Sequence, residues 1–210
     1  MKNYFAIVSL GLLLNSCYPG GAEYVDQVDL VYTNYNPNFD FSTLSTFTLP
    51  DSIPFVDDEN RGTKIEFLDE PYRSTILANL KTQMESRGYT YVDHNSNADW
   101  LILPTVSKST STYYYYDPAY WNYWAYPDWG AGWGWGYPGY GGGTYLSSIK
   151  TGTVMVQAVW DDPSISEDQP KPVQWVGVLS GLLQGSQSSV NTRIDRNIPQ
   201  MFAQSEYFRK

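Results

Sequence analysis

The chain has 210 residues, a formal net charge of -9 at pH 7 and an aromatic content of 17%. This length suffices for one domain with a substantial core. The acidic balance, without a cluster of lysines and arginines, argues against nucleic acid or an anionic lipid surface as a partner. Cys17 is the only cysteine, so internal disulfides are excluded and packing must stabilise the fold.

The first seventeen residues have the layout of a secretory signal peptide. Lys2 lies in a short polar start, and an almost unbroken apolar run of about eleven residues follows at 4–14. A membrane-spanning helix needs roughly twenty such residues, so a permanent span is not expected. We therefore expect residues 1–16 to be a cleaved signal.

The motif Leu14-Asn15-Ser16-Cys17 resembles the loose lipoboxes of Bacteroidetes lipoproteins. It predicts a diacylglyceryl group on the Cys17 sulfur and cleavage just before this residue; the alternative is an incidental cysteine. Two or three acyl chains anchor a protein stably, whereas one chain is marginal. Residues 17–24 would then be a short tether to a domain at 25–208. The expected location is the cell envelope, with the outer membrane favoured, facing the periplasm or the cell surface.

The first half of that domain shows two strand patterns and one helix pattern. Apolar residues alternate within 25–35, and a turn-like start at Asp40 leads into a second strand that ends near residue 49. A helix is expected from Pro71 to just before Gly88, with Asp69 or Glu70 as its cap. Its apolar stripe comprises Tyr72, Ile76, Leu77, Leu80 and Met84.

The second half shows three extended segments and another helix. Residues 98–106 read as a buried strand, and 152–161 and 173–181 as antiparallel partners. A helix carries Val190, Ile194 and Ile198, and Pro199 is expected to kink or divide it. The predicted fold class is α+β, with one antiparallel or mixed β-sheet packed against two amphipathic helices.

An aromatic segment at 113–145 separates two of these strands. It holds ten of the nineteen tyrosines and five of the eight tryptophans, with neither helical nor strand periodicity. Three interpretations stay open: a low-complexity loop partly folded on its own domain, a surface that stacks on glycan or contacts an envelope protein, and a contact with the membrane interface. The candidate binding rings are Tyr120, Trp121, Trp124, Trp129, Trp133 and Trp135.

Short motifs in a fixed order resemble a family of bacterial lipoproteins known as domain of unknown function 4136. They are Asp40-Phe41 with Phe47, Gly88-Tyr89, Ala98-Asp99, Gly152-Thr153-Val154 with Trp160-Asp161, and Gln174-Trp175-Val176-Gly177. Gln157 departs from the acidic residue common at its position, and the aromatic segment is richer than usual. The resemblance implies an α+β lipoprotein facing the periplasm or the cell surface, and it carries over no catalytic residue.

Nothing in the sequence points to a reaction. His94 is the only histidine, so a multi-histidine metal site is excluded, and it lies in a polar turn. Asp93, Asn95, Asn97 and Asp99 alternate like a calcium loop, but Ala98 stands where glycine is needed. We therefore predict no catalytic residue, no metal and no cofactor, and a structural or binding module of uncharacterised activity. The alternative is an envelope enzyme acting on cell-wall or glycan material.

Overall fold

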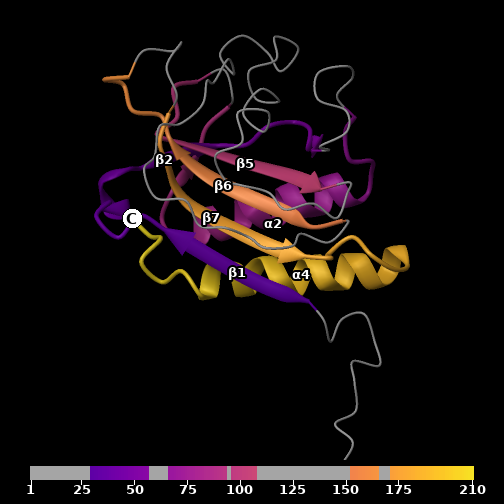
Figure 1. Ribbon diagram of the computed structural model, residues 1–210. Helices are drawn as coiled ribbons and strands as arrows, with labels where there is room; N and C mark the ends of the chain where they lie inside the picture. Colours follow the sequence, from indigo (N-terminus) through magenta and orange to yellow (C-terminus); the bar gives the residue numbers. More distant parts are fainter. Residues whose placement is uncertain (1–28, 57–65, 94–95, 108–151, 166–170) are drawn as a thin grey trace, which may run out of the picture.

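The computed structural model describes residues 29–56, 66–93, 96–107, 152–165 and 171–210. The expected signal peptide, Cys17, the tether, His94 and the aromatic segment lie outside these residues. Within them, seven strands form a single sheet, and two α-helices pack against one of its sides (Figure 1). The predicted α+β class is confirmed.

Four strands at one side of the sheet form an antiparallel group. In spatial order they are β1 (Leu30–Tyr35), β7 (Val173–Ser180), β6 (Val154–Trp160) and β5 (Trp100–Ser107), and every neighbouring pair is antiparallel. The run of apolar residues in β5 is buried along its whole length. The expected antiparallel partnership of 152–161 with 173–181 is therefore confirmed.

The rest of the sheet is parallel, so the mixed form of the predicted sheet is the correct one. A 3-10 turn at Phe41–Thr43 precedes β2 (Thr46–Thr48), which pairs in parallel with both β5 and β4 (Thr90–Tyr91). The short β3 (Phe55–Val56) also runs parallel to β5. The physical reason lies in the connection, because β2 and β4 are joined through a helix, and a parallel pair requires such a long crossover.

Helix α2 (Tyr72–Ser86) buries Ile76, Leu80 and Met84 as the apolar stripe predicted. Gly88 follows it with a φ of +90°, the left-handed conformation that suits glycine at a helix end. Pro71 occupies the N-cap position, which has no capping side chain, but the expected Glu70 contributes from one residue earlier: its Oε2 accepts a hydrogen bond from the Ser74 N–H at 3.4 Å. The same carboxylate also pairs with Arg73 at 2.7 Å, within the same turn.

Helix α4 (Gln187–Ala203) begins after Ser186, whose hydroxyl accepts a hydrogen bond from the Ser189 N–H at 3.4 Å. It runs through Pro199 as one helix, so the expected division does not occur. Proline removes one helical hydrogen bond and crowds the preceding turn, which costs about 3 kcal/mol. The residue before Pro199, Ile198, and two residues after it, Met201 and Phe202, are buried in the core. Their packing offsets this cost.

The core lies between the sheet and the two helices. Its centre is aromatic and includes Phe208 from the tail after α4; the other rings are Phe41, Trp100, Trp175 and Phe202. Gly177 of β7 lies under this layer, where an added Cβ would stand 2.2 Å from the Met201 Sδ. Only glycine allows α4 to approach the sheet this closely.

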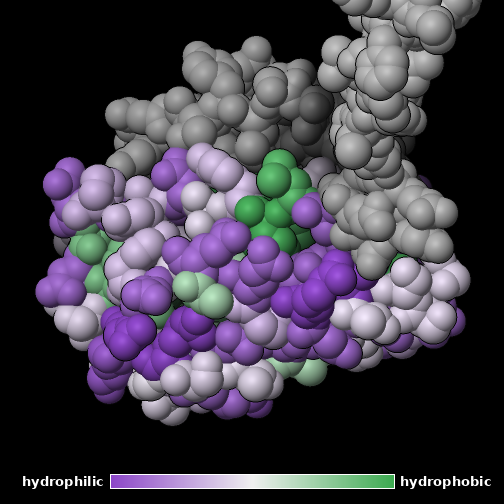
Figure 2. All heavy atoms as spheres, turned by 90° about the horizontal axis from the view of Figure 1, so that it is seen from below, coloured by the Kyte–Doolittle hydropathy of each residue, from purple (hydrophilic) through white to green (hydrophobic). Residues whose placement is uncertain are grey.

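The outer side of α4 faces solvent. Seen from that side, the described surface is mostly hydrophilic, with small hydrophobic patches (Figure 2). Neither helix in the described part of the chain combines the length and the apolar content needed to cross a bilayer.

Candidate functional site

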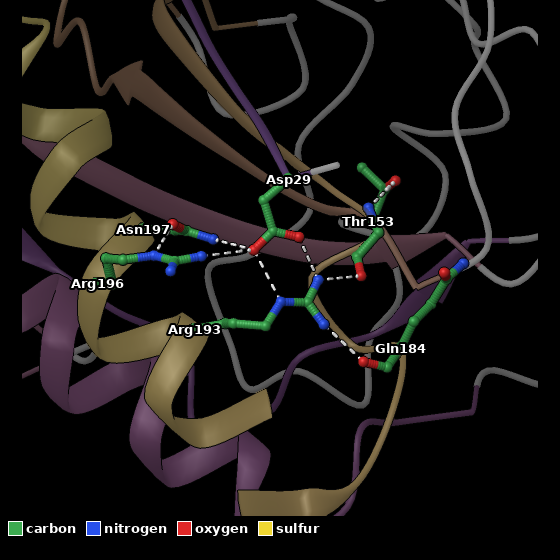
Figure 3. A network of polar contacts seen from close by, with 7 residues as sticks. Asp29, Thr153, Gln184, Arg193, Arg196 and Asn197 are labelled. Carbon is green, nitrogen blue, oxygen red and sulfur yellow. Dashed lines mark hydrogen bonds and ion pairs between the residues drawn. The ribbon is translucent and has the colours of Figure 1, made fainter. Parts of the chain in front are cut away.

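The site residues predicted from sequence cannot be placed. Cys17 and the six candidate rings of the aromatic segment lie outside the described residues, so lipidation and ring binding stay predictions. The most tightly built polar site among the described residues is a different one. It is centred on Asp29, the residue just before β1 (Figure 3).

Asp29 forms a buried ion pair with Arg193 of α4. The Arg193 Nε donates a hydrogen bond to Asp29 Oδ2 at 2.7 Å, and its Nη2 bonds the other carboxylate oxygen, so the pair is bidentate. The Asp29 side chain is 6% exposed and that of Arg193 2%. Fork-to-fork pairing fixes both side chains in direction as well as distance.

Further polar groups complete this site. The Arg193 guanidinium donates to two backbone carbonyls, those of Gln184 at 2.6 Å and Gly181 at 2.7 Å. On the carboxylate side, the Asn197 amide donates to Asp29 Oδ2 at 2.7 Å. Arg196 reaches the same oxygen at 3.3 Å from an exposed position. We call Asp29, Arg193, Asn197 and the two carbonyls the Asp29 clasp.

Three separate segments meet in the clasp. Arg193 and Asn197 lie four residues apart on α4, so both project from the same helix face. The carbonyls come from the turn between β7 and α4, which begins at Gly181 with a φ of +69°. The clasp therefore ties the start of the described chain to the turn after the last strand and to the last helix.

The polar groups of the clasp hold separate segments of the chain together. Buried charges are tolerated when they are paired and hydrogen-bonded, and each charged group here has several partners. Among the described residues, no group of three or more His, Cys, Asp or Glu side chains could hold a metal ion. The arrangement is suited to holding Asp29, directly before β1, at a fixed point on α4.

Sequence reasoning missed the clasp, although one signal for it existed. Arg193 lies within the apolar face of its helix, three residues after Val190 and directly before Ile194. A charged residue on a buried stripe needs a partner of opposite charge. The sequence does not say which of the carboxylates it will meet, because Asp29 is 164 positions away.

A second polar site explains the Ala98-Asp99 motif. The Asp99 Oδ2 accepts hydrogen bonds from the backbone N–H groups of Ser45 and Thr46, both at 2.8 Å, and from the Thr46 hydroxyl at 2.9 Å. Desolvation alone would raise the pKa of Asp99, but these hydrogen bonds outweigh it and the pKa is lowered. The carboxylate thus fixes the start of β2, which assigns the motif a structural role.

A shallow pocket of about 300 Å³ lies beside α2 and β4. Its basic residues already have partners within it: the Lys81 Nζ lies 4.0 Å from the centre of the Tyr91 ring, and Arg73 pairs with Glu70. We assign this pocket no ligand.

Comparison with known proteins identifies similar chains. A family model described as "Domain of unknown function (DUF4136)" matches residues 31–205. The crystal structure of a DUF4136 family protein from Bacteroides thetaiotaomicron is similar, with 26% identity, a TM-score of 0.61, and coverage of 86% of this chain and 97% of that one. No curated protein matches the chain.

Two further solved structures show weaker likeness. A PelC dodecamer from Paraburkholderia phytofirmans shares 10% identity at a TM-score of 0.37, covering 82% of this chain and 96% of its own. A protein from Xanthomonas campestris shares 7% at a TM-score of 0.32, covering 84% and 89%.

Proposed function

We propose, from the premise that the chain belongs to the DUF4136 family of domains of unknown function, that it is a lipid-anchored structural or binding module of a Gram-negative cell envelope. The observation that carries the proposal is the motif Leu14-Asn15-Ser16-Cys17 directly after a short apolar run. Acylation of Cys17 would attach the chain to a membrane from outside the cytoplasm.

The Asp29 clasp supports this proposal by giving such an anchor a fixed point on the domain. Asp29 lies twelve positions after Cys17, and a fully extended chain covers at most about 3.6 Å per position, or roughly 43 Å in all. Because the clasp holds Asp29 against α4, the edge formed by β1 and α4 would lie nearest the bilayer. The domain would stay close to the membrane in a restricted range of orientations.

The proposal is tested by replacing the lipidated residue. Cys17→Ala in the native host is expected to abolish labelling by an alkyne fatty acid and to move the protein out of the membrane fraction. Ser16→Gly is the matched control, since it keeps a small residue before the cysteine and should leave both properties unchanged. Retention of Cys17→Ala in the membrane fraction without a lipid label would contradict the proposal.

A non-catalytic role is part of the same proposal. It is supported by the clasp, in which the charged groups of Asp29 and Arg193 pair with each other. It is also supported by Asp99, whose carboxylate accepts hydrogen bonds from backbone N–H groups. Turnover of peptidoglycan or capsular glycan by the purified protein would instead favour an envelope enzyme.

A further inference from the structure

Strand β1 forms the one long edge of the sheet in the described part of the chain. It is the outermost strand and pairs only with β7, along all six of its residues (Figure 1). The opposite edge, β4, and the side strand β3 have two residues each. Every residue of β1 is at least partly exposed, and Leu30 and Tyr35 are 62% and 41% exposed. The sheet therefore offers one row of backbone groups that is long enough to pair with a further strand.

The backbone of β1 alternates between groups that bond to β7 and groups that point outward. The Asn36 N–H, directly after the strand, donates to the Gln174 carbonyl at 2.9 Å, so Asn36 and every second residue before it bond to β7. The N–H and C=O groups of Val31, Thr33 and Tyr35 therefore point away from the sheet. The Tyr35 N–H has a local side-chain acceptor. Among the described residues, none bonds to the outward groups of Val31 and Thr33.

Strand β1 lacks the features by which natural proteins protect an exposed edge. Protected edges are short, carry charged side chains or proline, or are distorted by a bulge. The six residues of β1 read LVYTNY, without a charge or a proline, and their register with β7 is continuous. Valine, threonine and tyrosine also favour extended strands. This edge is therefore suited to strand addition, whereas β4 is protected by its short length.

A second copy of the same strand complements this edge. Antiparallel pairing about a two-fold axis at Thr33 places Thr33 opposite its own counterpart, and Val31 opposite Tyr35 of the second copy. Threonine pairs, and pairs of a β-branched with an aromatic side chain, are favourable cross-strand neighbours. Each copy has a formal net charge of -9, so most of its surface repels another copy. The uncharged β1 brings no like charges opposite each other.

We propose that the protein forms a two-fold symmetric dimer in which the β1 strands of two copies pair antiparallel and join the two sheets into one. At the centre of the interface, the Thr33 N–H of each copy donates to the Thr33 carbonyl of the other. The N–H and C=O groups of Val31 pair in the same way with those of Tyr35. Because the same edge is used on both copies, the assembly closes at two chains.

This dimer goes beyond the proposed function and does not depend on the lipid anchor, but it is compatible with one. Asp29 lies four positions before Thr33, so the two Asp29 residues are eight positions apart along the paired strands, or about 27 Å. Each tether extends to roughly 43 Å. Both chains of the dimer can therefore be anchored in the same bilayer.

Disulfide crosslinking tests the register of the dimer. In a full chain carrying Cys17→Ala and Thr33→Cys, the two introduced thiols lie opposite each other, with Cα atoms about 5.5 Å apart, which a disulfide can bridge. Mild oxidation should give a covalent dimer in high yield. The matched control is Cys17→Ala with Leu30→Cys, a highly exposed position that lies six positions, or about 20 Å, from its counterpart and should give little dimer. Equal crosslinking of the two variants, or none with Thr33→Cys, would overturn the proposal.

Sedimentation over a range of concentrations supplies a second measurement, and the full Cys17→Ala chain should show a monomer–dimer equilibrium. Thr33→Pro removes an outward N–H and keeps the bonds to β7, so it should raise the dissociation constant by about tenfold or more through the two central hydrogen bonds. Thr33→Val keeps the N–H and the side-chain shape, and as the control it should dimerise like the parent chain. A parent chain that stays monomeric, or a Thr33→Pro chain that associates like Thr33→Val, would refute pairing through β1. The crosslinking decides the question if Thr33→Pro does not fold.

Discussion

Neutralising Asp29 should destabilise the domain strongly. Asp29→Asn keeps the shape of the side chain but removes its charge, and it leaves the Arg193 guanidinium, 2% exposed, without a counter-charge. Breaking a buried ion pair by changing one partner costs about 3–5 kcal/mol. For a domain of this size, each kcal/mol corresponds to roughly 2–4 °C in melting temperature, so we expect a fall of about 6–20 °C.

Arg196 offers a matched control for this change. It contacts the same Asp29 oxygen at 3.3 Å, but its side chain is 49% exposed. Exposed ion pairs contribute at most about 1 kcal/mol, so Arg196→Gln should be close to wild type. The two variants each remove one charge from the same network and differ in how deeply that charge is buried.

The assay is chemical denaturation at neutral pH, followed by fluorescence and circular dichroism on a Cys17→Ala chain. Coincident transitions by the two probes establish that a single free energy of unfolding applies. Adding Arg193→Met to Asp29→Asn removes the orphaned charge, so the double variant should lose less than the sum of the single losses. If Asp29→Asn and Arg196→Gln are equally mild, the reasoning from burial is refuted.

Two further predictions concern the motif residues. Gly177→Ala would place a Cβ 2.2 Å from the Met201 Sδ and 2.6 Å from the Trp175 ring, and such overpacking costs about 1–3 kcal/mol in the free energy of unfolding; a wild-type denaturation midpoint would contradict this close contact. Because the pKa of Asp99 is lowered in the folded state, its contribution is present above the unfolded value of about 3.9 and is lost as pH falls through the lowered folded value. Asp99→Asn should therefore destabilise the domain at pH 7 and reduce the loss of stability on acidification, and a variant whose stability falls with pH as steeply as that of wild type would refute the assignment.

The strands and helices with strong local patterns could be predicted from the sequence. The apolar runs of β5, β6 and β7 and the stripes of α2 and α4 depend on neighbours within a few residues, and the structure confirms them. The undivided helix at Pro199 could not be predicted, because the packing that offsets the proline comes from the rest of the domain.

The motifs of the family resemblance acquire reasons only in three dimensions. Glycine is required at position 177 because Met201, on a helix two dozen residues later, lies close to it. An aspartate is required at position 99 because its carboxylate accepts hydrogen bonds from the backbone N–H groups of Ser45 and Thr46. In sequence these residues are short patterns without a visible cause. Their order was enough to indicate the family, since order and spacing are properties of the chain itself.

The sequence by itself determined the fold class, the family and the expectation of a lipid anchor at Cys17, since each depends on local pattern or composition. Only the tertiary structure decided that Asp29 meets Arg193, and that Asp99 accepts hydrogen bonds from the backbone N–H groups of Ser45 and Thr46. The reason is physical: a side chain shows its charge and size in the sequence, but the partner that satisfies it is chosen when strands and helices distant along the chain are brought together.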